Sequence, residues 1–144
     1  MCRKHSRRKV RPCSAPMLIN RGLQNADIET QERMLVEAFA GGWATTHHYD
    51  CLVDMRNVLT LAGAYKEVQD SSVITICDAM RIPLANIRER HAKTGRMGVT
   101  GEELQLLRVF GGFYADFWMR QPVALYELAC DELGKFNESL KEAA

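Results

Sequence analysis

Three side chains near the middle of the chain have the types and spacing of a metal-ligand cluster. His47 and Cys51 are four residues apart, so on a helix they share one face, where an imidazole and a thiolate can bind one metal ion. His48 points to a different face, and no third ligand lies nearby in the sequence. Capping and packing roles are therefore favoured over metal binding, and we predict no metal site.

The segment from Val73 to Lys93 resembles a helix-turn-helix, in which a second helix enters the major groove of DNA. Cys77 suits the small position midway along the first helix, and Ile82 suits the apolar position in the turn. Ile87 suits the branched position one turn into the second helix. The sequence therefore predicts a turn at Ile82, followed by a helix that begins at Pro83.

Two residues depart from that motif, while two more agree with its buried side. Arg81 stands where the turn usually has glycine, and Arg90 stands where a further buried apolar residue is common. Ile76 and Met80 have the spacing expected of residues packed between the two helices.

The polar positions of the second helix could read or hold nucleic acid. An asparagine can pair with adenine, an arginine can pair with guanine, and lysine or arginine can bind phosphates. The alternative is that these side chains only solvate the outer face of a helix. The candidate residues are Asn86, Arg88, Arg90, Lys93 and Arg96.

Charge is strongly segregated along the chain, although the formal net charge is only +1. Residues 1–26 hold seven basic residues and no acidic one, whereas the remainder holds the other 12 and all 18 acidic residues. Such a basic arm would add phosphate or minor-groove contacts beside a DNA-binding motif. The candidate residues of the arm, residues 1–24, are Arg3, Lys4, Arg7, Arg8, Lys9 and Arg11.

Catalysis has no motif to support it in this chain. The sequence contains no phosphate-binding glycine loop, no nucleophile elbow, no zinc-protease helix motif and no dinucleotide fingerprint. We therefore predict a protein that is not an enzyme, with no catalytic residue and no cofactor.

Length and composition indicate one globular domain. The chain has 144 residues, of which 47% are hydrophobic and 26% are charged. This is enough for a single core, which we place in residues 25–144, after the arm. Its longest apolar run is far shorter than the ~20 residues of a membrane-spanning helix. Five widely spaced cysteines without C-x-x-C spacing fit a reducing compartment, so we predict a cytoplasmic protein without membrane contact.

Hydrophobic periodicity and capping residues predict five or six helices after the arm. Thr100 and Glu103 have the spacing of a capping box at the start of the fifth helix. Gly111-Gly112 in that helix suggests a kink or a close helix crossing. The expected ranges are 25–40, 46 to 65 or 67, 73–81, 83–93, 101–119 and a last helix opened by Pro122.

Apolar residues of the last two helices have more than one possible role. The aromatic residues between Phe110 and Trp118 favour core packing over a partner-binding surface. The last helix repeats apolar residues at alternating spacings of three and four, which favours internal packing over a homodimer seam. That stripe consists of Tyr126, Ala129, Leu133, Phe136 and Leu140.

Three segments resemble small helical proteins of proteobacterial prophages and mobile elements. They are Ser14–Ile19, Met34–Ala40 and Arg81–Arg90. The resemblance extends over most of residues 14–135 and supplies no catalytic residue. It implies a bacterial cytoplasmic regulator or a phage factor that interacts with its host.

Together these patterns predict an all-α protein, a compact bundle of five to six helices with a disordered basic N-terminal arm. The predicted function is a non-enzymatic nucleic-acid-binding regulator, with DNA as the favoured partner. It would use the helix-turn-helix-like segment 73–93 and the arm. The alternative is a protein-binding adaptor or host-interacting phage factor that acts through its acidic and aromatic helical surface, and a homodimer through the last helix is also possible.

Overall fold

The computed structural model describes residues 25–65, 68 and 70–143, with side chains from residue 28 onward. Every regular element in this part of the chain is an α-helix, which confirms the predicted fold class. The elements are α2 (Asn25–Ala40), α3 (Thr46–Gly63), α4 (Ser71–Ala79), α5 (Arg81–Thr94), α6 (Gly101–Met119) and α7 (Val123–Ala143).

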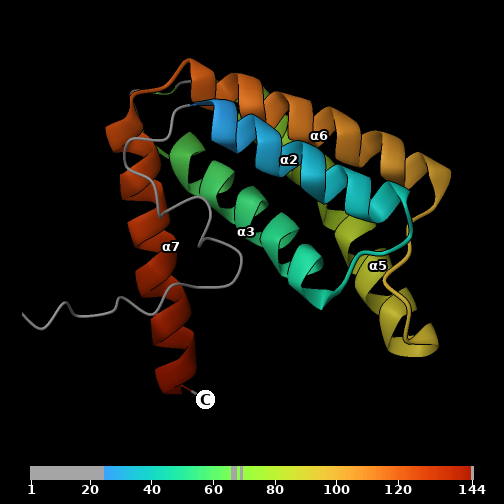
Figure 1. Ribbon diagram of the computed structural model, residues 1–144. Coiled ribbons are helices and arrows are strands. Elements are labelled where there is room, and N and C mark those ends of the chain that lie inside the picture. The colour runs from blue at the N-terminus through green and yellow to red at the C-terminus, as the bar shows by residue number, and fades with distance from the viewer. Residues whose placement is uncertain (1–24, 66–67, 69, 144) are drawn as a thin grey trace, which may run out of the picture.

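The helices form a bundle in which α2 lies along α6 (Figure 1). Helix α3 packs against α7 and α4, so it connects the two ends of the bundle. Figure 1 shows α7 at one end and α5 at the other. The two regions predicted to contact partners are therefore far apart.

Capping residues explain where α5 and α6 end and begin. Gly95 has a φ of 73°, the left-handed conformation that glycine adopts without steric cost, and it ends α5. The backbone amide of Glu103 donates to Thr100 Oγ1 at 3.2 Å, and the Thr100 amide donates to Glu103 Oε1 at 2.9 Å. The predicted capping box is therefore confirmed.

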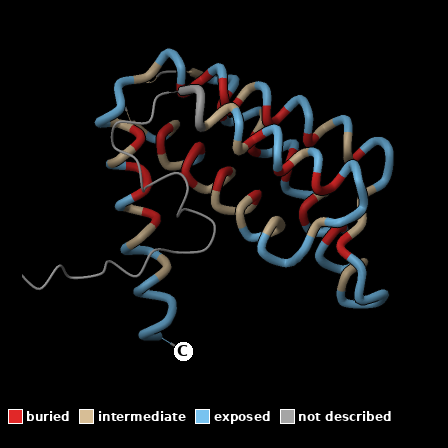
Figure 2. The backbone as a smooth tube through the Cα atoms, in the orientation of Figure 1, coloured by how far each residue is buried: buried red, intermediate tan, exposed pale blue. Residues whose placement is uncertain are grey.

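The core is formed largely by the inner face of α6 (Figure 2). Phe110, Tyr114 and Phe117 are among the largest fully buried side chains of the described residues. Trp118 continues this set and packs edge to face on Tyr126 of α7, with ring centroids 4.7 Å apart. The predicted core role of these aromatic residues is confirmed.

Three expectations about the elements require correction. Helix α3 ends at Gly63, earlier than residue 65 or 67. The N-cap of α4 is Asp70, whose carboxylate accepts from the Ser72 amide at 2.9 Å, so this helix begins at Ser71, earlier than the expected residue 73. Ile82, expected in the turn between two helices, lies within α5 instead, and its side chain is 63% exposed.

Candidate nucleic-acid interface

Helices α4 and α5 meet at a single residue, Met80. Its φ and ψ are −78° and −15°, and backbone hydrogen bonds continue across it, from Met80 N to Ile76 O and from Leu84 N to Met80 O. A helix-turn-helix normally has a turn of about three to four residues. Pro83 has no N–H to donate to the preceding turn, which accounts for the break in the helix. The junction between the two helices is therefore shorter than the turn of that motif.

Leu84 and Ile87 fix the orientation of α5 on the bundle. Both side chains are buried, and the Tyr49 hydroxyl of α3 donates to the Leu84 carbonyl at 3.0 Å. Cys77 and Met80 are also buried at the α4 end, as expected. These contacts leave the opposite face of α5 exposed to solvent.

Arg90 lies on the inner side of α5 and serves a structural role. Its guanidinium donates to the Gly98 carbonyl at 2.7 Å and forms an ion pair with Glu103 on α6 at 2.9 Å. A second hydrogen bond to Glu103 at 3.2 Å makes the pair bidentate. The interaction joins α5, the following loop and the capping box of α6, so the Arg90 guanidinium already has protein partners.

Glu103 shows the electrostatic result of this arrangement. Its burial disfavours the charged form, but hydrogen bonds from Arg90 and from the Thr100 amide outweigh burial and hold the pKa of Glu103 below its ordinary value. The pair therefore remains charged at neutral pH.

An exposed stripe of α5 carries the remaining basic residues. Arg81, Ala85, Arg88 and Ala92 are spaced at helical repeats of four, three and four residues, and all four are exposed. Arg81 and Arg88 are therefore about 10 Å apart along the helix axis, with only small side chains between them. Within the described residues, neither arginine forms an ion pair.

The other predicted residues of this segment differ in their availability. Asn86 is exposed, and so is Arg96, which lies in the loop just after Gly95. Lys93 is exposed but bound to Glu89 at 2.9 Å, and this contact lowers the pKa of Glu89. Arg3, Lys4, Arg7, Arg8, Lys9 and Arg11 lie outside the described residues.

The histidine and cysteine cluster caps and packs the start of α3. His48 Nδ1 accepts from the Thr45 amide at 2.9 Å, and its ring packs edge to face on Trp43, with centroids 5.4 Å apart. Burial and the neighbouring His47 lower the pKa of His48. His47 Nε2 lies 3.8 Å from Cys51 Sγ. In the described part of the chain, no three His, Cys, Asp or Glu side chains gather closely enough to hold a metal ion.

No protein family, curated protein or solved structure matches the chain. Among the described helices, none is long and apolar enough to cross a membrane.

Two residues of interest, Arg81 and Glu32, were not identified from the sequence patterns. Arg81 was assigned to a turn, although its spacing of seven residues from Arg88 is a signal that both share a helix face. Glu32 is an acidic residue that is only 9% exposed, and it lies on α2 against Gly111 of α6. Its position four residues after Ile28 and three before Leu35 places it on the apolar face of α2, which is the signal that could have found it.

Proposed function

We propose that the protein is a nucleic-acid-binding regulator that uses the exposed stripe of α5. The observation that carries this proposal is the pairing pattern of the basic residues. Arg90 and Lys93 each contact an acidic side chain, whereas Arg81 and Arg88 share an exposed stripe without one among the described residues. Unneutralised arginines at this spacing are suited to bind phosphates.

Small and polar neighbours support close approach to a polyanion. Ala85 and Ala92 leave the backbone of the stripe accessible, and exposed Asn86 is a side chain able to pair with adenine. Arg96, just after the end of the helix, is exposed and forms no ion pair with the residues that the structure describes. The basic arm, residues 1–24, would add further phosphate contacts.

Fluorescence anisotropy with labelled double-stranded DNA across a salt series tests this proposal. Replacing Arg81 and Arg88 together by alanine should weaken binding and reduce the log–log salt slope by about two. The matched control replaces Lys135 and Lys141 of α7, which removes the same charge from the other end of the bundle and should change neither quantity. Equal affinity and slope for both double variants would contradict the proposal.

A further variant separates the arm from α5. It replaces the six candidate basic residues of the arm by serine in the full-length chain and keeps every residue of α5. If all binding disappears in this variant, and the α5 variant binds normally, the arm alone carries the activity.

A second candidate function, protein binding, is favoured by the distal part of α7. Tyr126, Ala129 and Leu133 are buried, but Phe136 and Leu140, which continue the same stripe, are 57% and 55% exposed. Such a surface fits an apolar protein partner or a second copy. Sedimentation velocity and nuclease-treated pull-downs with the wild type and a Phe136→Ser, Leu140→Ser variant test this alternative. Loss of a stoichiometric protein partner or dimer in the variant would support it.

A further inference from the structure

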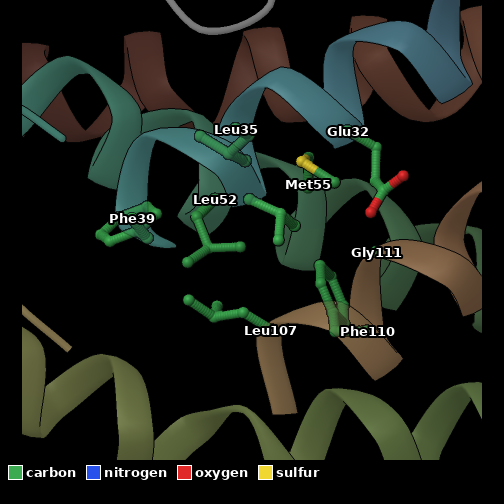
Figure 3. A pocket seen from close by; sticks show the side chains of 9 residues that line it. Glu32, Leu35, Phe39, Leu52, Met55, Leu107, Phe110 and Gly111 are labelled. Atoms are coloured by element: carbon green, nitrogen blue, oxygen red, sulfur yellow. The ribbon is translucent and has the colours of Figure 1, made fainter. Parts of the chain in front are cut away.

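The closest approach of α2 to α6 places a carboxyl group inside the helix contact. A Cβ built on Gly111 would lie only 2.6 Å from Glu32 Cδ and 2.7 Å from its Cγ. Glycine is therefore the residue that allows the Glu32 side chain to lie directly on the backbone of α6. Figure 3 shows this carboxylate beside Gly111, at the edge of a pocket between the helices.

In the described part of the chain, the pocket beside Glu32 is apolar. The pocket beside it is lined by apolar side chains from three helices and has a volume of about 10 Å³, close to the space of one water molecule. Glu32 makes no hydrogen bond or ion pair within the described residues, and it is only 9% exposed. The lining side chains are Leu35, Val36, Phe39, Leu52, Met55, Leu107 and Phe110.

Among the described residues, the charged groups that shift the pKa of Glu32 come from its own helix. Arg33 and Glu29 lie on α2 and form an ion pair with each other. In the pocket beside the carboxyl, helices α3 and α6 contribute only apolar side chains and Gly111. Burial raises the pKa of Glu32 above its ordinary value of 4.5; Arg33 opposes this shift in part, and Glu29 adds to it.

We propose that Glu32 makes the α2–α6 contact depend on pH, so that the two helices pack most stably when its carboxyl is protonated and separate more often when it is ionised. On ionisation the proton passes to solvent water or buffer. The carboxylate then gains hydration as α2 moves away from Gly111. Separation exposes the apolar faces that α2 and α6 otherwise bury against each other, including Phe39 and Phe110.

The pH range of this opening follows from linkage. The closed form binds a proton more tightly than the open form, in which the carboxyl titrates near 4.5. Opening is therefore independent of pH below that value. The equilibrium constant for opening rises, by at most about tenfold per pH unit, between pH 4.5 and the pKa of the closed form. Above the pKa of the closed form this equilibrium constant no longer changes with pH.

Native-state hydrogen exchange of the full-length protein by NMR tests the proposal. Protection factors for the amides of residues 33–39, corrected for intrinsic exchange, should fall as pH is raised above 4.5. Those of residues 52–59 in α3 should stay constant, since the opening is local. In a Glu32→Gln variant the α2 protection factors should not depend on pH, whereas in Glu37→Gln, which removes an exposed carboxylate from the same helix, they should behave as in the wild type.

Two results would overturn the proposal. One is an equal pH dependence of α2 protection in the wild type and in Glu32→Gln. The other is a fall of protection in α2 and α3 by the same factor, which would indicate global unfolding. The carboxyl ¹³C shift of Glu32 provides an independent check, because a midpoint at the ordinary value for glutamate would also exclude a closed form that holds the proton.

Discussion

Two buried carboxyl groups of the bundle, those of Glu103 and Glu32, lie in opposite electrostatic surroundings. Glu103, at the junction of α5 and α6, receives hydrogen bonds from Arg90 and the Thr100 amide. Glu32, at the crossing of α2 and α6, faces apolar side chains and the backbone of Gly111. Both side chains have similarly low exposure, 7% and 9%, so burial alone does not separate them.

The two carboxyl groups differ in their hydrogen-bond partners, and this difference sets the sign of each pKa shift. Burial disfavours both charged forms, but only Glu103 has donors that outweigh it, so its pKa is lowered while that of Glu32 is raised. One carboxylate therefore stabilises the fold at neutral pH, and the other opposes it. The same amount of burial thus produces a structural ion pair in one place and a proton-sensitive contact in the other.

The largest expected effect comes from removing the compensated carboxylate. Glu103→Ala should lower the free energy of unfolding at neutral pH by about 2–3 kcal/mol, because the Thr100 amide loses its acceptor and Arg90 its partner. Urea denaturation measures this loss. Glu102→Ala, an exposed neighbour in the same first turn, is the control and should change stability far less. Equal losses in both variants would show that the ion pair contributes nothing beyond the helix dipole.

A smaller effect of opposite sign is expected at the uncompensated carboxylate. Glu32→Gln should raise the free energy of unfolding at neutral pH by about 1 kcal/mol, because no charge then has to be desolvated. The same urea titration measures it, with Glu37→Gln as the control on the exposed face of α2. A decrease in stability would mean that Glu32 has a favourable partner as an anion.

The adjacent glycines of α6, Gly111 and Gly112, test whether Glu32 lies directly on the helix backbone. Gly112→Ala should stabilise the protein by about 0.5–1 kcal/mol, because alanine is the better helix former and nothing lies within 4 Å of the added methyl group. Gly111→Ala should lack this gain, since its methyl group displaces Glu32 from the crossing. Thermal unfolding distinguishes the two variants, and equal gains would contradict the close approach.

The smallest expected effect is a pH dependence of the stability that Glu103 contributes. The stabilisation by Glu103 is fully present above its unfolded pKa of about 4.5 and is lost as pH falls through its lowered folded pKa. The stability difference between the wild type and Glu103→Gln should therefore shrink from about pH 6 to about pH 3. A constant difference over this range would indicate that the carboxylate has an ordinary pKa in the folded protein.

Much of the fold could be predicted because its signals are local. The capping box at Thr100 and the glycine at position 95 set helix ends through residues close in sequence. Gly111-Gly112 also correctly indicated a close crossing. The residue that contacts Gly111 lies on a helix about 80 residues earlier in the chain, and no local sequence pattern identifies it as Glu32.

The candidate interface was predicted less completely, for a related reason. Arg90 occupies a position where an apolar residue is common, and this departure was the sign that it faces inward to Glu103. Ile82 and Arg81 were placed in a turn, but the junction at Met80 keeps both in a helix and turns them outward. The nucleic-acid and protein-binding hypotheses remain predictions for the binding experiments.

The distal part of α7 has a consequence for how the chain is degraded. Beyond Leu133 the described residues of this helix have no buried side chain, so about ten residues lack the core packing that stabilises the rest of the helix. So short a helix is only marginally stable in water and unfolds locally far more often than the bundle does. Limited trypsin digestion should therefore cut first, within the described part of the chain, after Lys135 and Lys141, and release the tail while the core stays intact.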